Sequence, residues 1–185
     1  LEKVWENTGG GAGGRAPLSL WSPACGADGS RFFIKVGDYA SPSHNKPAEA
    51  VFLRLRHTDA GAYMNADDKV LMADLVSKFA PYPKRYHMVW SQRGTTGQSD
   101  GGGPVDSVYF WKPVPRSERY VAMGMIATTT EEPPPLEAVR TVPRKWVVPT
   151  KMESVQVWND EGSGGRPGSV WAINECGLIA ATKGY

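Results

Sequence analysis

The side chains best suited to chemistry in this chain are carboxylates that lie beside glycine-rich segments. Asp160 and Glu161 directly precede Gly162 and Gly164, and an aspartate also follows Gly37. Glycine lets a ligand approach the backbone, and a neighbouring carboxylate can accept hydrogen bonds from sugar hydroxyls or hold a cation. One tryptophan, at position 146, is the candidate for an exposed contact. The candidate ligand-binding residues are therefore Asp38, Tyr39, Asp160, Glu161, Gly162, Gly164 and Trp146.

The same glycine-rich segments have a simpler interpretation, which the sequence favours. Residues 9–14 formally match the G-x-G-x-x-G dinucleotide motif, but a strand pattern over 16–21 follows where that motif needs a helix. Residues 97–103 and 162–165 occupy equivalent places further along the chain. All three segments therefore fit hairpin loops that contain positive-φ glycines.

Motifs for catalysis and metal binding are absent from the sequence. There is no G-x-S-x-G, no H-E-x-x-H and no phosphate loop, and His44, His57 and His87 lack metal-ligand spacing. The sequence predicts no catalytic residue, no metal and no cofactor, and hence a protein that is not an enzyme. Cys25 and Cys176 either pair across equivalent positions or remain two reduced, buried thiols.

Composition restricts the partners. Among 185 residues, 21 Lys and Arg stand against 19 Asp and Glu, giving a net charge of +2 without a basic cluster. Nucleic acid is therefore excluded as a partner. No apolar stretch reaches the roughly 20 residues of a transmembrane helix, so no transmembrane segment is predicted. A cytoplasmic or membrane-peripheral location is favoured, and secretion is left open because the chain begins at Leu1.

A repeated phrase organises the chain. A Val-Trp pair followed by a glycine-rich segment occurs at Val4-Trp5, Val89-Trp90 and Val157-Trp158, and a second tryptophan follows each at Trp21, Trp111 and Trp171. Six of the seven tryptophans thus fall on two repeated positions, which predicts three structural repeats. A residue that recurs in every repeat is best explained as core, because large aromatics contribute most to burial.

Short runs rich in β-branched and aromatic residues, separated by 21 Gly and 15 Pro, predict an all-β protein. The predicted strands are 4–5, 18–21, 32–36, 51–55, 86–90, 107–111, 120–126, 138–142, 145–148, 154–158, 169–173 and 177–182. One α-helix is predicted near 65–80, because Met72, Leu75, Val76 and Phe79 recur at helical spacing. We expect this helix to cover an end or an open side of the β body.

These patterns together predict one domain over 1–185. It contains three repeats, at about 4–57, 86–148 and 154–185, with a helical linker at 63–81. The predicted fold is a pseudo-threefold body like a β-prism, and a β-trefoil or sandwich units are the alternatives.

The ordered motifs resemble a known family. The phrase V-W-x-[DN]-x-G-[ST]-G, then S-[LVF]-W-[KS]-P, then a Gly-Asp step and a proline loop resemble the Vps62 family, also called the DUF946 type, whose repeats occur in some VPS13-like proteins. The Gly-Asp step is intact only at Gly37-Asp38, and the sequence alignment puts Gly124-Met125 and Ala180-Ala181 at the corresponding places. The resemblance implies a link to vacuolar protein sorting and membranes, and it brings no catalytic residues.

Three kinds of function follow from these observations. The first is a non-catalytic binding module that recognises a glycan or a membrane surface through its Gly-rich and Pro-rich loops. The second is a structural or scaffolding component of a larger assembly, in contact with a protein partner through the helix, the segment 133–135 or Trp146. The third is a targeting domain of a pore-forming or trafficking protein.

Overall fold

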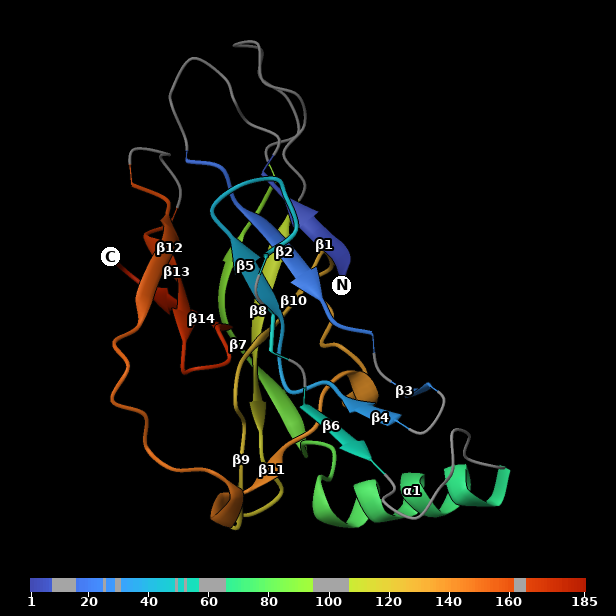
Figure 1. Cartoon of the computed structure of the whole chain (residues 1–185). Helices are drawn as coiled ribbons and strands as arrows, with labels where there is room; N and C mark the ends of the chain where they lie inside the picture. The colour runs from blue at the N-terminus through green and yellow to red at the C-terminus, as the bar shows by residue number, and fades with distance from the viewer. Residues whose placement is uncertain are drawn as a thin grey trace.

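The structure is a computed structural model of the 185-residue chain. It describes residues 1–7, 16–24, 26–28, 31–48, 50–51, 53–56, 66–94, 107–161 and 166–185. These residues form a mostly β protein with a single α-helix and several antiparallel sheets, and none of the described sheets closes on itself (Figure 1).

The elements follow each other along the chain as short strands interrupted by one helix and two 3-10 turns. They are β1 (Glu2–Glu6), β2 (Ser19–Ser22), β3 (Gly26–Asp28), β4 (Arg31–Ile34), β5 (Tyr39–Ser41), β6 (Leu53–Arg56), α1 (Ala66–Phe79), β7 (Arg85–Gln92), β8 (Val108–Val114), β9 (Tyr120–Val121), β10 (Ile126–Thr128), η1 (Leu136–Ala138), β11 (Val142–Pro143), η2 (Arg144–Trp146), β12 (Val155–Asn159), β13 (Gly168–Ile173) and β14 (Leu178–Lys183).

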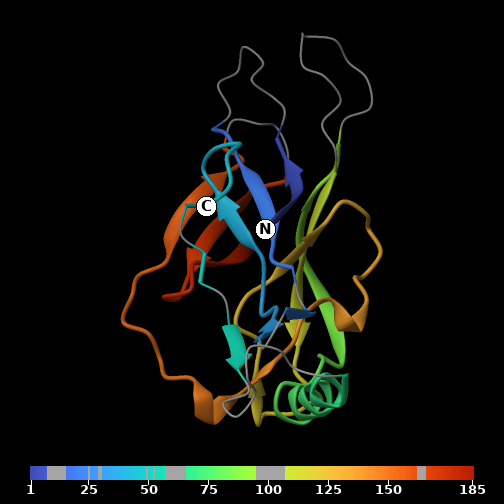
Figure 2. The ribbon, with the colours of Figure 1, turned by 45° about the vertical axis from the view of Figure 1, so that its right-hand side comes forward.

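Three antiparallel triplets of strands dominate the molecule. The triplet β1-β2-β5 and the triplet β14-β13-β12 join edge to edge into a six-stranded sheet, and β10-β8-β7 forms a sheet of its own. Figure 2 shows this third triplet, in green and yellow, beside the blue and red strands of the larger sheet. Two smaller sheets, β11-β9 and β3-β4-β6, complete the described strands.

Each triplet contains a register shift directly before its first tryptophan. The shift lies between Lys3 and Trp5 in the first triplet, between Met88 and Trp90 in the second, and between Gln156 and Trp158 in the third. A bulge of this kind turns the bulged strand and redirects its side chains. The Val-Trp phrase of the sequence is therefore the signature of a bulge that directs a tryptophan into the core.

The main core is built from equivalent residues of the three triplets. Trp5, Trp90 and Trp158 are all buried, and the ring centroid of Trp90 lies 5.9 Å from that of Trp158. Their strand partners Leu20, Phe110 and Val170 are fully buried in the same cluster. The prediction that the repeated tryptophans form the core is confirmed for the first tryptophan of each copy. Of the second tryptophans, Trp111 is buried, whereas Trp21 and Trp171 are partly exposed.

The three triplets meet in a closed ring of backbone hydrogen bonds. The N–H of Asp38 donates to the carbonyl of Met125 at 2.9 Å. The N–H of Met125 donates to the carbonyl of Ile179 at 2.8 Å, and the N–H of Ile179 donates to the carbonyl of Asp38 at 2.9 Å. The residues that precede them are Gly37, Gly124 and Leu178, and a Cβ on Gly124 would lie 2.7 Å from the Cβ of Leu178. Two glycines therefore leave room for the single leucine.

This ring corrects the sequence alignment of the third copy. Strand pairing sets Leu20 opposite Ala40, Phe110 opposite Ala127 and Val170 opposite Ala181. Counting back from these alanines puts Leu178-Ile179, and not Ala180-Ala181, at the place of Gly37-Asp38. The alignment was wrong because alanines repeat at this point and hide a shift of two residues.

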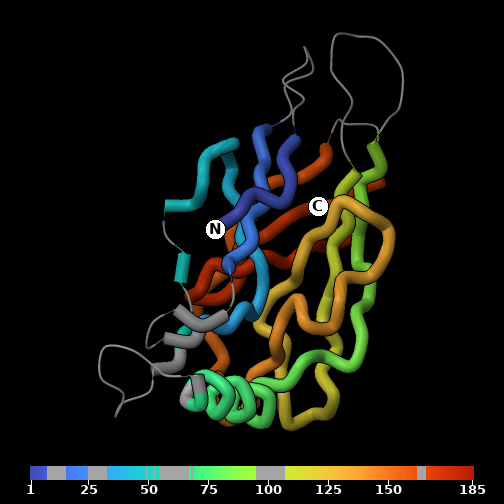
Figure 3. Tube along the Cα trace, turned by 90° about the vertical axis from the view of Figure 1, so that its right-hand side faces the viewer, coloured from blue at the N-terminus to red at the C-terminus, as the bar shows by residue number. Residues whose placement is uncertain are grey.

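Helix α1 lies across one end of the β body, as Figure 3 shows. Val76 of the helix packs in a second buried cluster with Ile34, Tyr39 and Leu178. Ala80, the residue that follows the helix, belongs to the same cluster. The expectation that the helix covers an end of the body is thus confirmed. Phe79 departs from the predicted apolar stripe, because half of it is exposed.

Two predicted strands take other conformations. Residues 144–146 form the 3-10 turn η2 where a strand over 145–148 was predicted, and the 3-10 turn η1 occupies the start of the predicted strand 138–142. Pro143, at φ −56°, precedes η2, and a proline lacks the N–H that a longer sheet ladder would need. The β-prism arrangement stays a prediction.

Candidate functional site

An exposed aromatic pair marks a groove at the end of the molecule that carries α1. Phe79, at the end of α1, stacks on Trp146, at the end of η2, with ring centroids 6.2 Å apart and ring planes at 27°. Both side chains are 51% exposed. Large aromatics that remain half exposed as a pair indicate a contact surface, because burial in the core would stabilise them more.

Local structure fixes the position of Trp146. Pairing of Pro143 with Tyr120 brings β11 beside β9, and η2 begins at the next residue. The backbone N–H of Arg144 donates to the carbonyl of Arg119 at 2.8 Å, and its Nε donates to the carbonyl of Glu118 at 2.8 Å. These bonds hold the turn against β9, so that Trp146 projects towards the helix end.

Positive charge surrounds the aromatic pair. The groove has a volume of about 770 Å³ and is lined by the pair and by Lys78, Glu118, Arg119, Tyr120, Pro143, Arg144 and Lys145. Four of these residues are cationic and one is acidic. Lys78 also forms an ion pair with Asp74 at 2.7 Å. The groove, which we call the aromatic–basic groove, therefore suits a partner that is both apolar and anionic.

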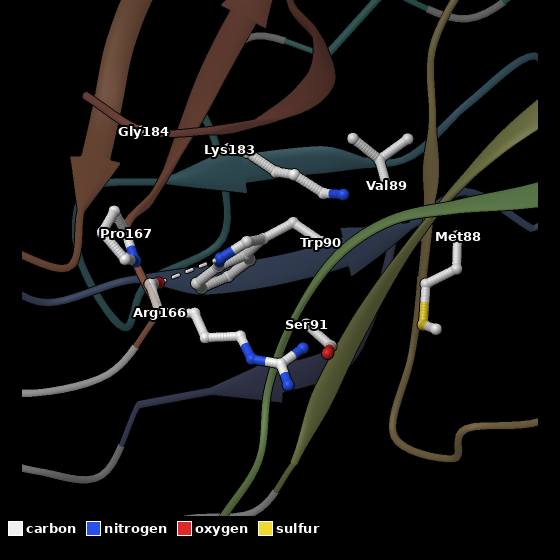
Figure 4. A pocket seen from close by; sticks show the side chains of 8 residues that line it. All are labelled: Met88, Val89, Trp90, Ser91, Arg166, Pro167, Lys183 and Gly184. Carbon is white, nitrogen blue, oxygen red and sulfur yellow. Dashed lines mark hydrogen bonds between the residues drawn. The ribbon is translucent and has the colours of Figure 1, made fainter.

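A second hollow lies between the second and third triplets. It has a volume of about 520 Å³ and is lined by Met88, Val89, Trp90, Ser91, Arg166, Pro167, Lys183 and Gly184 (Figure 4). The indole N–H of Trp90 donates to the carbonyl of Arg166 at 3.1 Å, which joins β7 to the segment before β13. We call this hollow the Trp90 pocket.

Asp38 and Tyr39 lie inside the molecule, at the ring where the triplets meet. The Asp38 carboxylate is fully buried, forms an ion pair with Lys35 at 2.8 Å and accepts a hydrogen bond from the N–H of Ala127 at 2.9 Å. Burial raises the pKa of Asp38, and the neighbouring Lys35 opposes that rise. Burial also raises the pKa of Tyr39 to about 12, and its hydroxyl donates to the carbonyl of Val51. Both side chains are thus engaged in internal contacts.

Asp160 is buried at the base of the hairpin between β12 and β13. Its Oδ1 accepts a hydrogen bond from the N–H of Gly168 at 2.7 Å. Asn7 makes the equivalent bond in the first triplet, from the N–H of Leu18 at 2.6 Å. The pair therefore closes two hairpins in the same way. Glu161 is exposed beside Asp160, and Gly162 and Gly164 lie outside the described residues.

The structure thus separates the candidate residues named from the sequence. Among the described candidates, Trp146 lies in the aromatic–basic groove, whereas Asp38, Tyr39 and Asp160 are buried in two other regions. Sequence reasoning missed the cations of the aromatic–basic groove and the residues of the Trp90 pocket. The two tryptophan-containing hollows had no local motif, because their residues come from segments far apart in the chain. A short signal was available in Arg144-Lys145-Trp146, where two cations precede the one tryptophan that is not at a repeated position.

Other titratable groups do not converge. Among the residues that the structure describes, no three His, Cys, Asp or Glu side chains form a group that could hold a metal ion. Cys176 is a half-buried free thiol, and burial raises its pKa; Cys25 lies outside the described residues. Within the same described part of the chain, no helix is long and apolar enough to cross a membrane.

Comparison with protein families decides the family. The family model described as vacuolar protein sorting-associated protein 62 matches residues 1–177 of the chain. This chain belongs to the Vps62 family. The resemblance inferred from the repeated motifs is confirmed, and the match covers the first two triplets and, in the third, β12 and β13, ending directly before β14. No curated protein matches the chain.

A solved structure shares the fold of this Vps62-family chain. The crystal structure of GNIP1Aa from Chromobacterium piscinae superposes with a TM-score of 0.65 at 19% sequence identity. The similarity covers 100% of this chain and 31% of the GNIP1Aa chain. The same fold therefore occurs as less than a third of a longer protein.

Proposed function

We propose that this protein is a non-catalytic module that binds the surface of anionic membranes through the aromatic–basic groove. The observation that carries the proposal is the stacked, half-exposed pair Phe79–Trp146 within a cluster of lysines and arginines. Tryptophan favours the interface between headgroups and acyl chains, and juxtamembrane cations are attracted to anionic lipids. The family membership and the shared fold with part of a longer chain support a module of this kind.

An exposed aliphatic side chain that follows the groove in sequence favours a membrane over a glycan. Val148, two residues beyond Trp146, is 86% exposed. A sugar would stack on the aromatic rings but would gain little from an aliphatic group. A bilayer interface buries both kinds of side chain at once.

Co-sedimentation with lipid vesicles tests the proposal. We expect binding to vesicles that contain phosphatidylserine and weak or no binding to pure phosphatidylcholine. Trp146→Ala is expected to weaken the binding about tenfold, because a half-exposed tryptophan side chain contributes roughly 1.5 kcal/mol or more on insertion. Lys145→Gln is expected to weaken it about fivefold, equivalent to about 1 kcal/mol per cation, and added salt should weaken it further.

A matched control removes a cation elsewhere. Arg93 follows the end of β7 that points away from α1 and pairs with Glu131 at 2.8 Å, so Arg93→Gln changes the net charge as Lys145→Gln does. It should leave vesicle binding unchanged. Equal losses in the two charge variants, or no vesicle binding by a folded protein, would contradict the proposal. In the second case a glycan or protein partner would take the place of the membrane.

A further inference from the structure

The Trp90 pocket differs from the equivalent positions of the other two triplets. In each triplet the residue two positions after the first tryptophan faces a residue of the next strand. These pairs are Asn7 with Leu18, Gln92 with Val108, and Asp160 with Gly168. Where the first two triplets carry the buried side chains of Leu18 and Val108, the third therefore carries Gly168. A Cβ at this glycine would lie 2.2 Å from the Trp90 ring. The indole of Trp90 can lie against the third triplet because position 168 has no side chain.

The charges of the pocket also occur in one triplet alone. Arg166, two residues before Gly168, corresponds to Ala16 in the first triplet. Lys183 follows Thr182, which pairs with Ser169 as Ser41 pairs with Ser19, so Lys183 corresponds to Pro42. In the second triplet Tyr109 pairs with Thr128, so the equivalent of Lys183 there is Thr129. The third triplet thus carries cations where the other two carry Ala16 and Asp106 in place of Arg166, and Pro42 and Thr129 in place of Lys183. Both cations line one hollow.

Nothing in the described part of the chain neutralises these cations. Neither Arg166 nor Lys183 forms an ion pair with a described residue, and none of the described residues that line the pocket is acidic. In Figure 4 the two cationic side chains lie on either side of the Trp90 ring, and Ser91 lines the same pocket. The pocket therefore combines two positive charges, a hydroxyl and an apolar wall.

We propose that the Trp90 pocket binds the phosphate group of a small phosphate monoester. The planar fork of an arginine matches two phosphate oxygens, and a lysine adds a compact charge. The indole of Trp90 and the thioether of Met88 would contact the organic part of the ester. A volume of about 520 Å³ lies within the range of small-ligand pockets, which runs from roughly 300 to 1,000 Å³.

This site is separate from the aromatic–basic groove, since no residue lines both hollows. Its occupancy therefore does not depend on the proposed membrane function. The phosphate could be carried by a soluble ester or by a lipid headgroup. The two sources share the same chemistry, and the experiment can separate them.

Titration with glycerol 1-phosphate, followed by NMR of the tryptophan indole N–H signals, tests the soluble source. We expect a saturable shift of the Trp90 signal. Arg166→Gln and Lys183→Gln should each weaken the affinity at least fivefold, because each removes one charge from the bound phosphate. Both side chains are exposed, so the fold should tolerate the changes. Arg93→Gln serves as the charge-matched control and should leave the affinity unchanged.

Vesicles that contain phosphatidic acid, a lipid phosphate monoester, test the second source. Binding that falls at least fivefold in Arg166→Gln while the free ester causes no shift would assign the pocket to a lipid headgroup. A shift with the free ester would assign it to a soluble ligand. If neither probe shows a dependence on Arg166 and Lys183, the proposal is overturned, whatever the outcome for the aromatic–basic groove.

Discussion

At the scale of single residues, a buried ion pair lies where the three triplets meet. Asp38 belongs to the ring of backbone hydrogen bonds, and its equivalents there are Met125 and Ile179. Two of the three equivalent positions thus carry apolar side chains, and the third carries a carboxylate held by Lys35. Breaking a buried ion pair is costly because it leaves one charge without a partner, whereas replacing both members can be nearly neutral.

Substitution of this pair should therefore be strongly non-additive. Lys35→Met is expected to lower the free energy of unfolding by about 3–5 kcal/mol at neutral pH. The double variant Lys35→Met/Asp38→Met should recover most of that loss, because Met125 already occupies an equivalent position. Urea unfolding of the wild type, both single variants and the double variant measures the coupling. Additive losses would show that the ion pair does not act as a unit.

The pH dependence of the Lys35→Met variant follows from the direction of the Asp38 pKa. Burial raises this pKa above its usual value of 3.8 in the folded state, so the folded protein binds the proton more tightly than the unfolded chain. The contribution of Asp38 protonation to the free energy of unfolding is therefore fully present below about pH 4 and is lost as the pH rises through the folded-state pKa. Loss of Lys35 removes the opposing effect, so the deficit of Lys35→Met should shrink between pH 7 and pH 4.

At the scale of elements, the hairpins of the first and third triplets are closed by a side chain at the same place. Asn7 and Asp160 each accept a backbone N–H bond across the base of a hairpin, from Leu18 and Gly168 respectively. The indole N–H groups of Trp21 and Trp171 likewise donate to Ser19 and Ser169 at 2.8 Å and 2.9 Å. Polar side chains thus repeat along with the aromatic ones, because each buried N–H needs an acceptor.

Variants of Asp160 can separate a hairpin role from a ligand role. Asp160→Asn keeps the acceptor oxygen, as Asn7 does naturally, and should change the free energy of unfolding by less than about 1 kcal/mol. Asp160→Ala leaves the N–H of Gly168 without its partner and should cost about 1–3 kcal/mol. Thermal unfolding measures both. Unchanged stability in Asp160→Ala would instead leave this carboxylate available for a ligand.

At the scale of the whole molecule, the three triplets share the main core. The main cluster takes residues from all of them, such as Trp5, Phe110 and Val170, and the ring of backbone bonds needs one strand from each. A triplet alone would expose its apolar face to water. The molecule should therefore unfold as one cooperative unit.

This expectation is tested by comparing probes of different regions. Far-UV circular dichroism, tryptophan fluorescence and calorimetry should give the same transition midpoint. Val170→Ala, which creates a cavity in the third triplet, should lower all three midpoints together, because a large-to-small change in a fully buried residue is destabilising. Separate transitions, or a shift confined to one probe, would show that the triplets unfold independently.

The sequence alone determined the repeated core, the helix and the family. Trp5, Trp90 and Trp158 were identifiable because hydrophobic residues at fixed spacing repeat wherever the same strand pairing repeats. The helix over Ala66–Phe79 followed from its apolar spacing, although the exposure of Phe79 did not, since only the position of Trp146 makes that stacking possible.

Only the tertiary structure decided the candidate sites. Asp38 and Asp160 were candidate ligand-binding residues in the sequence. In the structure Asp38 forms an ion pair with Lys35, and Asp160 accepts a hydrogen bond from the N–H of Gly168. The aromatic–basic groove joins the end of α1 to a turn more than 60 residues later, and the Trp90 pocket joins β7 to the residues around β13. Local patterns determine which residues face a core, because strand and helix periodicity act over a few residues. Surface sites depend on which distant segments the completed core brings together.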